Sequence, residues 1–208
     1  MSEDGGGNSE IEDRIAEGEK KPFDVRFSPS YSRAPAPGLA VLLYQPEIPQ
    51  NTGNIARTCA ATHTPLYLVE PLGFRITDKL LKRAGLDYWP YVRMKLFADF
   101  AAAHGAIPHS RMVYFSAHAP RLYHDFSFQP GDCLVFGPET RGLPQELLAT
   151  YPGDVIKIPI DRGRVRSLNL ATSVGVALFE AIRQLNTQAA SSSRRFIFGR
   201  CSGSGATD

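Results

Sequence analysis

The architecture follows from residues 155–185, which read VIKIPIDRGRVRSLNLATSVGVALFEAIRQL. Residues 155–160 form a short apolar run rich in β-branched side chains, which is typical of a buried strand. An arginine-rich loop, 161–166, follows, and Ser167 stands where a helix N-cap is expected. Apolar residues then recur every three or four positions over 168–185, as in one long helix. This order predicts a binding site for an anionic or polar ligand at a helix N-terminus.

Composition places the chain among globular proteins. Its 208 residues suit one domain with a substantial core, and the 43% apolar and 21% charged content is ordinary for that class. No apolar run is long enough to cross a membrane, and the N-terminus has no signal-peptide pattern. Three cysteines make neither a disulfide framework nor a zinc site, and the five histidines lack metal-ligand spacing. We therefore expect a cytoplasmic protein without a membrane segment or a metal.

The chain divides into three parts by composition. Residues 1–37, rich in Gly, Ser, Glu and Pro, predict a flexible N-terminal tail with an acidic excess. Residues 38–186 predict one domain, and the small, polar residues of 187–208 predict a second tail. The domain holds a mild excess of basic side chains, although the net charge of the whole chain is only +2. That excess is consistent with contact to nucleic acid.

Predicted strands and helices alternate within the domain. The strands are 39–44, 66–69, 112–115, 133–136 and 155–160; the helices run from Asn51 or Thr52 to about Thr62, and over 77–84, 97–104, 144–150 and 168–185. This alternation indicates an α/β fold with a mostly parallel sheet flanked by helices. Ligands of such sheets bind where the strands end, which here means the loops 45–51, 70–74, 115–119, 137–142 and 161–167.

Two of these loops combine residue types that a plain turn does not need. In Pro46–Arg57, Asn51 could hydrogen-bond a ribose or simply cap the helix, and Arg57 could reach back to the loop or lie on the surface. Phe136–Pro144 holds two glycines and two prolines, with Glu139 and Arg141 at its apex. We expect Gly137 to let a ligand approach the main chain closely.

The third unusual segment is Ser167-Leu168-Asn169. Helix capping accounts for Ser167, but it does not account for the three arginines at 162, 164 and 166. Arginines beside a helix N-terminus indicate a phosphate group or a nucleic-acid backbone. The signatures of Rossmann, P-loop and nucleophile-elbow sites are all missing from the sequence.

These segments resemble the motifs of the SPOUT superfamily of RNA methyltransferases. The likeness is closest to the small tRNA 2'-O-ribose methyltransferases of the TrmL (YibK-like) group, and it spans 39–186, including Glu70-Pro71-Leu72-Gly73-Phe74 and Lys82-Arg83-Ala84-Gly85-Leu86-Asp87-Tyr88. It implies a deep C-terminal trefoil knot, S-adenosyl-L-methionine as cofactor, and a homodimer whose subunits share the site. It also implies tRNA as substrate, methylated on the ribose of the wobble cytidine or uridine.

The resemblance further implies roles for single residues. Arg57 matches the family arginine proposed to help deprotonate the ribose hydroxyl; because a guanidinium keeps its proton in proteins, stabilisation of the alkoxide is the first role we assign it and proton removal the second. Positions that organise the catalytic site match Asn51, Glu139 and Asn169. Cofactor contacts match Phe115, Gly137, Ile158 and Ser167. Contacts to tRNA are assigned to Arg83, Asp87, Arg141, Arg164 and Arg166.

Two other functions stay open at this point. One is 2'-O-methylation of ribosomal RNA, and the other is a cofactor-binding or RNA-binding module without turnover. The chain also departs from the group at Phe115-Ser116-Ala117-His118-Ala119, where the group has Thr-Thr-Lys-Gly character.

Overall fold

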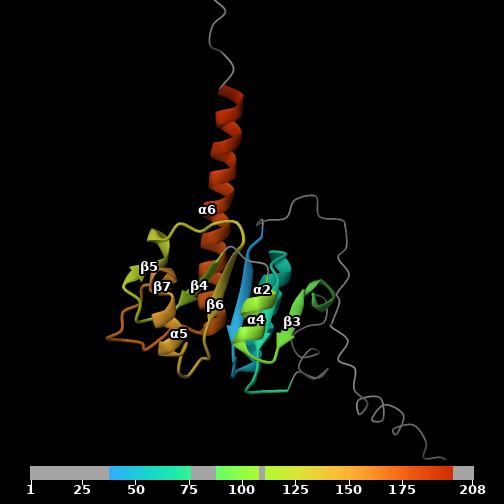
Figure 1. The fold of residues 1–208 in the computed structure, drawn as a ribbon, viewed down its shortest axis with the longest axis vertical. Helices are drawn as coiled ribbons and strands as arrows, with labels where there is room; N and C mark the ends of the chain where they lie inside the picture. The colour runs from blue at the N-terminus through green and yellow to red at the C-terminus, as the bar shows by residue number, and fades with distance from the viewer. Residues whose placement is uncertain (1–37, 76–87, 108–110, 199–208) are drawn as a thin grey trace, which may run out of the picture.

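A computed structural model describes residues 38–75, 88–107 and 111–198, and its centre is a seven-stranded sheet (Figure 1). The strand order is β3-β2-β1-β6-β4-β7-β5, and every pairing is parallel. The strands are β1 (Ala40–Tyr44), β2 (Leu66–Val69), β3 (Met94–Phe97), β4 (Arg111–Phe115), β5 (Arg121–Leu122), β6 (Asp132–Phe136) and β7 (Val155–Lys157). The predicted α/β fold with a mostly parallel sheet is confirmed.

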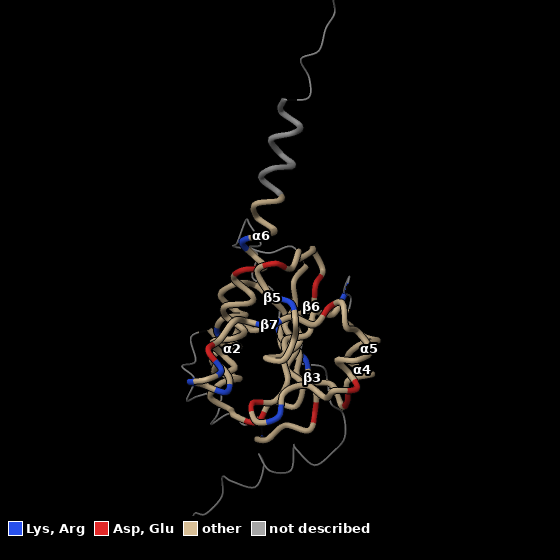
Figure 2. Tube along the Cα trace, turned by 90° about the vertical axis from the view of Figure 1, so that its left-hand side faces the viewer, with Lys and Arg blue, Asp and Glu red and all other residues tan. Residues whose placement is uncertain are grey.

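Helices cover both faces of the sheet. Helices α2 (Pro49–Ala61) and α6 (Leu170–Phe198) pack on one face, and α4 (Phe100–Ala106) and α5 (Gln145–Thr150) lie on the other; Figure 2 shows α2 on the side opposite α4 and α5. Strand residues alternate between the two resulting cores: in β1, Val41 and Leu43 face α2 and α6, whereas Ala40 and Leu42 face the other layer. Because both faces are buried, the central strands are apolar except at the start of β4 and β6, where Arg111 and Asp132 form a 2.9 Å ion pair.

The strand order brings late parts of the chain into the middle of the sheet. Strand β6 lies between β1 and β4, and β7 lies between β4 and β5. Phe136 pairs with both Leu43 and Phe115, and Phe115 pairs with Ile156, so four strands end together at one edge. This order is compatible with the trefoil knot, which stays a prediction.

Several predicted boundaries were wrong. The helix expected over 97–104 begins at Phe100, because Asp99 caps it by accepting a 2.7 Å hydrogen bond from the Ala102 amide, and Phe97 instead ends β3. Strand β7 ends at Lys157, before Pro159, which has no amide to donate to a neighbouring strand. Strands β3 and β5 were not predicted. The helix expected over 77–84 and the tail 1–37 lie outside the described residues.

Helix α6 differs from its prediction at both ends. It begins at Leu170 rather than 168, and it continues past 185 to Phe198, projecting from the body of the molecule (Figure 1). The division of the chain into tail, domain and tail stays a prediction.

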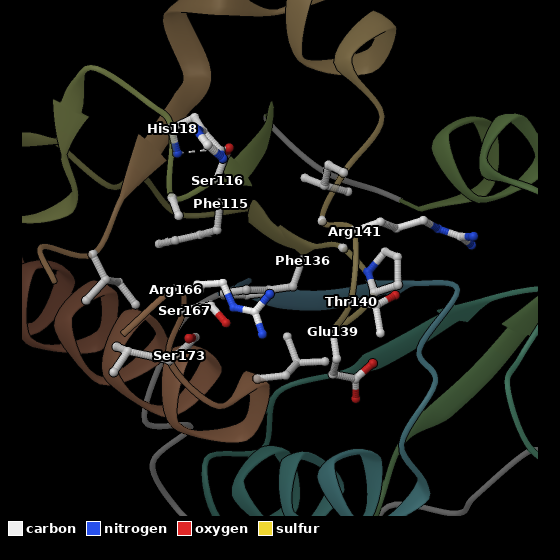
Figure 3. Close-up of a pocket in the computed structure, with 18 of the residues that line it drawn as sticks. Phe115, Ser116, His118, Phe136, Glu139, Thr140, Arg141, Arg166, Ser167 and Ser173 are labelled. Atoms are coloured by element: carbon white, nitrogen blue, oxygen red, sulfur yellow. Dashed lines mark hydrogen bonds between the residues drawn. The ribbon is translucent and has the colours of Figure 1, made fainter. Parts of the chain in front are cut away.

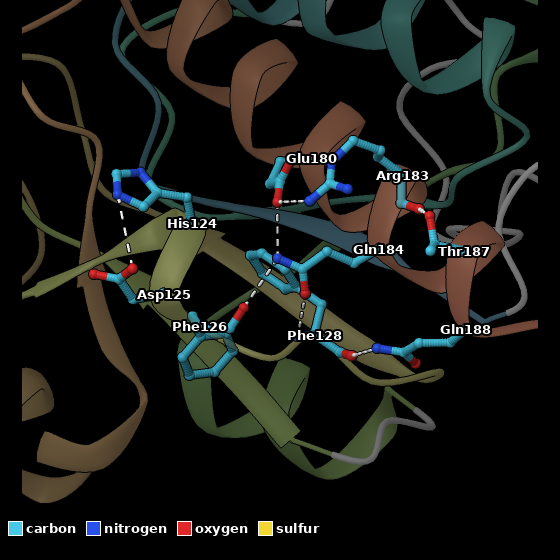
Figure 4. Close-up of polar contacts among 9 residues, drawn as sticks. All are labelled: His124, Asp125, Phe126, Phe128, Glu180, Arg183, Gln184, Thr187 and Gln188. Atoms are coloured by element: carbon cyan, nitrogen blue, oxygen red, sulfur yellow. Dashed lines mark hydrogen bonds and ion pairs between the residues drawn. The ribbon is translucent and has the colours of Figure 1, made fainter. Parts of the chain in front are cut away.

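A glutamine fixes α6 against the connection between β5 and β6. The Gln184 amide accepts a hydrogen bond from Phe128 N (3.1 Å) and donates to Phe126 O (3.0 Å) and to Glu180 Oε1 (2.8 Å), as Figure 4 shows. Arg183 also donates to the Glu180 carboxylate, and this lowers the pKa of Glu180. Side-chain contacts of this kind set the height of α6 on the sheet, and with it the position of its N-terminus.

Candidate active site

The carboxyl ends of β4, β6 and β7 and the start of α6 surround a cavity of about 680 Å³ (Figure 3). Three of the predicted ligand loops, 115–119, 137–142 and 161–167, contribute to its wall. The Phe115 and Phe136 rings stack at its base, with centroids 4.5 Å apart and planes 11° apart. The wall therefore combines aromatic and aliphatic surface with loop main chain.

The four residues assigned to the cofactor all line this cavity. Phe115 ends β4, Gly137 follows β6, Ile158 follows β7, and Ser167 precedes α6. They come from four segments far apart in sequence, which the sheet order brings to one edge. The cofactor contacts themselves stay predictions.

Ser167 is not the helix cap that the sequence predicted. The Asn169 side chain caps α6, with Oδ1 accepting from Ala171 N (2.9 Å) and Thr172 N (3.3 Å). Asn is as good an N-cap residue as Ser. Residues 167 and 168 line the cavity, so the helix begins two residues later than predicted. Ser167 thereby lies on the cavity wall rather than in the helix cap.

The absence of a side chain at Gly137 is required by the turn in which it lies. A Cβ atom placed there would lie 2.4 Å from both Gly142 C and Leu143 N. The Phe136–Pro144 turn folds so tightly that its two ends touch through main chain alone. The turn thus requires a glycine at this position, and because Gly137 lines the cavity, the close approach of a ligand to its main chain stays a prediction.

The Glu139 carboxylate joins this turn to the start of α2. Its oxygens accept hydrogen bonds from Glu47 N (2.8 Å), Ile48 N (3.2 Å) and Asn51 Nδ2 (2.9 Å). Figure 3 shows the carboxylate pointing away from Phe115 and Ser116, towards α2. A carboxylate at this end of a helix is also stabilised by the helix dipole.

Asn51 extends the network to α6. It is 5% exposed, and its Oδ1 accepts a 2.8 Å hydrogen bond from Asn169 Nδ2. The helix-cap role considered for Asn51 was wrong, because α2 begins at Pro49 with Ile48 in the cap position. Asn51, Glu139 and Asn169 thus connect the N-termini of α2 and α6 through the Phe136–Pro144 turn.

A second set of hydrogen bonds joins the Phe136–Pro144 turn to the loop that follows β1. Thr140 donates through N (3.1 Å) and Oγ1 (2.9 Å) to the Glu47 carboxylate, and Arg141 donates to Gln45 Oε1 (2.7 Å). Glu47 and Glu139 therefore each accept hydrogen bonds from the opposite loop. These reciprocal hydrogen bonds hold the loop after β1 and the Phe136–Pro144 turn, which forms the rim of the cavity, in one relative position.

The arginines of the loop 161–166 lie in two different environments. Arg162 and Arg166 line the cavity, and Arg162 Nη1 lies 3.3 Å from His118 Nδ1. Arg164 instead forms a 3.1 Å ion pair with Asp161 and is not among the lining residues. The predicted tRNA contacts Arg83 and Asp87 lie outside the described residues.

Arg57 lies apart from the cavity. It is an exposed residue of α2, and its guanidinium carbon lies 4.7 Å from the centroid of the Tyr88 ring. Neither Arg57 nor Asn51 lines the cavity. The structure therefore brings Asn51, Glu139 and Asn169 together, but it does not place Arg57 against the cavity of its own chain.

Sequence reasoning gave no individual role to several lining residues, namely Ser116, Ala117 and His118 of the predicted loop 115–119, and Leu143 and Ser173 outside the predicted loops. The signal for most of them was their place just after a strand, and His118 was set aside because no metal-ligand spacing included it. Ser173 had no signal, since its position on the first turn of α6 is set by where that helix begins.

The described residues show neither a metal centre nor a membrane span. No group of three or more His, Cys, Asp or Glu side chains there could hold a metal ion. In the same part of the chain, no helix is both long enough and apolar enough to cross a bilayer.

Comparison with known proteins gives consistent matches. Residues 38–179 match the SpoU rRNA Methylase family. The chain is 48% identical over 145 residues to the tRNA (cytidine(34)-2'-O)-methyltransferase of Methylovorus glucosotrophus (strain SIP3-4), covering 69% of this chain and 94% of that protein.

Two solved structures extend the comparison. One, from work described as structural insights into the 2-OH methylation of C/U34 on tRNA, is 52% identical with a TM-score of 0.68, and the match covers 74% of this chain and 99% of that one. The AdoMet-bound rRNA methyltransferase from Sinorhizobium meliloti is 28% identical with a TM-score of 0.61, and the match covers 77% of this chain and 62% of that one.

Proposed function

Because the chain belongs to the SpoU rRNA methylase family, we propose that it methylates the ribose 2'-hydroxyl of the wobble nucleotide of tRNA, using S-adenosyl-L-methionine. The observation that carries the proposal is its 48% identity to a tRNA (cytidine(34)-2'-O)-methyltransferase across 94% of that protein. The 52% identical structure associated with C/U34 methylation supports the same nucleotide. The predicted SPOUT resemblance, enzyme class and cofactor agree with these matches.

The cavity fits the chemistry of S-adenosyl-L-methionine. Its volume of about 680 Å³ lies within the range of small-molecule sites, and its apolar wall suits an adenine ring. Phe115, Gly137, Ile158 and Ser167 would hold the nucleoside, and the cationic side chain of Arg162 suits the carboxylate of the methionine part. When bound, this group supplies a methyl on a positively charged sulfur, which leaves as a neutral thioether.

Arg57 is the residue we assign to the reacting hydroxyl. The ribose oxygen must lose its proton as its bond to the methyl carbon forms, so negative charge develops on that oxygen. A guanidinium beside it stabilises this charge, whereas proton removal by a guanidinium, which keeps its own proton in proteins, is harder. Asn51, Glu139 and Asn169 hold the N-termini of α2 and α6 in place and are therefore assigned to positioning.

The substrate backbone meets cationic residues near the rim. We assign Arg141 and Arg166, which line the cavity, to contact with tRNA phosphates, together with Arg164 and Arg83. Asp87 is assigned to tRNA contact as well, but not to the phosphates, because its carboxylate is negatively charged. Arg141 is held by Gln45, so its guanidinium is already ordered on the rim.

A homodimer accounts for the distance of Arg57 from the cavity. Val176 and Phe179, 36% and 57% exposed, lie about one turn apart on the side of α6 that faces away from the core. Exposed apolar side chains on a helix that otherwise packs well favour a protein partner. We assign that partner as a second copy whose Arg57 serves the first copy's cavity, in keeping with the shared site that the family resemblance implies.

A cytoplasmic location fits the substrate and the thiols. Cys59 and Cys133 are free and buried, and burial raises the pKa of the Cys59 thiol to about 12. Both therefore stay protonated and unreactive at neutral pH.

The test of the function has two steps. The purified protein is titrated calorimetrically with S-adenosylhomocysteine and is then given radiolabelled S-adenosyl-L-methionine with total tRNA. We expect S-adenosylhomocysteine to bind. We also expect label on the ribose of nucleotide 34 alone, where the tRNA becomes resistant to alkaline cleavage. Label in ribosomal RNA instead would assign the rRNA alternative, and binding without transfer to either RNA would leave a module without turnover.

Arg57→Ala should lower kcat by at least about a hundredfold, because it removes the charge that stabilises the developing alkoxide. Its affinity for S-adenosylhomocysteine, measured by calorimetry, should stay near that of the unmodified protein, because Arg57 does not line the cavity. Loss of cofactor affinity together with turnover would show instead that Arg57 supports the structure of the site.

A further inference from the structure

Tyr88 contacts α2 at two points on one helical face. Its ring lies under the Arg57 guanidinium, with 4.7 Å from the guanidinium carbon to the ring centroid. Its hydroxyl donates a 3.1 Å hydrogen bond to Gly53 O, four residues before Arg57. Residues four apart lie one above the other on a helix, so the ring spans one turn of α2 directly beside the arginine.

The ring itself is held in place. Tyr88 is half-buried and packs against the main core, and it opens the 3-10 turn η1 (Trp89–Tyr91), in which Tyr91 N donates to Tyr88 O (3.0 Å). A guanidinium over an aromatic face is attracted by the ring quadrupole and keeps its N–H groups available at its edge. The long side chain of Arg57 lies on an exposed surface of α2. Stacking on a fixed ring restricts that side chain before any substrate arrives.

We propose that Tyr88 is a positioning residue for the methyl transfer, holding the Arg57 guanidinium in the direction from which it meets the ribose oxygen. The proposal rests on the function proposed above for Arg57. Tyr88 does not touch the reacting atoms; it reduces the number of orientations that Arg57 samples. Misplacement of a catalytic group by about 1 Å can cost as much as a hundredfold in rate, so a loss of orientation should appear in kcat.

The test compares Tyr88→Leu, which removes the ring, with Tyr88→Phe, which keeps it. Tyr88→Leu should lower kcat roughly fivefold to tenfold, while KM for tRNA and affinity for S-adenosylhomocysteine change by less than about twofold. Tyr88→Phe should recover most of the rate. The matched control is Tyr91→Leu in the same turn: Tyr91 is 58% exposed, and this variant should keep kcat.

A double variant separates this proposal from the one on which it rests. In an Arg57→Ala background, Tyr88→Leu should change the residual single-turnover rate by less than about twofold, because the ring then has no guanidinium to hold. A slow Arg57→Ala with a normal Tyr88→Leu would overturn the positioning role alone. A normal Arg57→Ala would overturn the role of Arg57, and a Tyr88→Leu that raises only KM would make Tyr88 an RNA contact instead.

Discussion

The Glu139 carboxylate accepts three hydrogen bonds from one other loop, and none of its donors is a positively charged side chain. Two of the donors are the Glu47 and Ile48 amides just before the first turn of α2, which have no partner within that helix. A buried or half-buried carboxylate needs such donors to offset its loss of water. Hydrogen bonds from neutral amide groups to the Glu139 carboxylate therefore hold the Phe136–Pro144 turn against the start of α2.

Glu139→Gln should lower the free energy of unfolding by about 1–3 kcal/mol, because an amide group turns a donor towards amides that also donate. Urea unfolding followed by circular dichroism measures the change. Glu146→Gln, on the exposed surface of α5, makes the same chemical change and should leave the midpoint almost unmoved. Equal midpoints for the two variants would show that the Glu139 contacts contribute no net stability.

At the scale of an element, side-chain hydrogen bonds fix α6 at both ends of its buried part. Its N-terminus is capped by Asn169, which also bonds Asn51, and about four turns further on Gln184 bonds the Phe126–Phe128 segment (Figure 4). Between these points the helix buries an apolar stripe against the sheet. The position of the cap relative to the cavity therefore depends on contacts far from the cavity.

Gln184→Ala should destabilise the protein by about 1–3 kcal/mol, because it leaves the Phe128 amide and the Phe126 carbonyl without their partner. The loss is measured as a difference in unfolding free energy. Gln188→Ala is the control: its hydrogen bond to Phe128 O is longer, at 3.5 Å, so its cost should stay below about 0.5 kcal/mol. An equal loss for both variants would mean that helix propensity, rather than the Gln184 contacts, sets the cost.

At the scale of the whole molecule, we propose that each site is shared between two chains. The cavity is built by β4, β6, β7 and α6, whereas Arg57 belongs to α2 and does not line it. The exposed Val176 and Phe179 on α6 offer a surface through which a second copy can approach. A site shared across a two-fold axis appears twice in a dimer.

Complementation tests this arrangement. Arg57→Ala, and Ile158→Trp, whose larger side chain fills the cavity, should each be inactive as homodimers. Co-expression of the two variants with different affinity tags should give heterodimers with one intact site and about half of the normal activity per dimer. Adding Phe179→Glu to both chains should prevent the rescue by separating the subunits. Heterodimers that stay inactive would show that each site is complete within one chain.

Much of this architecture could be predicted from the sequence alone. The period of apolar residues gave the α/β alternation, and the rule that ligands bind at the carboxyl ends of parallel strands placed Phe115, Gly137 and Ser167 in one site. These predictions succeed because they depend on neighbours along the chain and on one general property of parallel sheets. The motifs also pointed to the family through a resemblance over 39–186, and the family match over residues 38–179 confirms it.

Other features depended on contacts between distant residues. Asn51 meets Glu139 across 88 positions and Asn169 across 118, so its apparent capping role could not be excluded from its own surroundings. The same holds for Gly137, whose missing side chain makes room for its own turn, and for Tyr88, which packs under an arginine 31 positions earlier. Hydrogen-bonding side chains are satisfied by whichever partner the folded chain brings near, and local spacing carries no information about that partner.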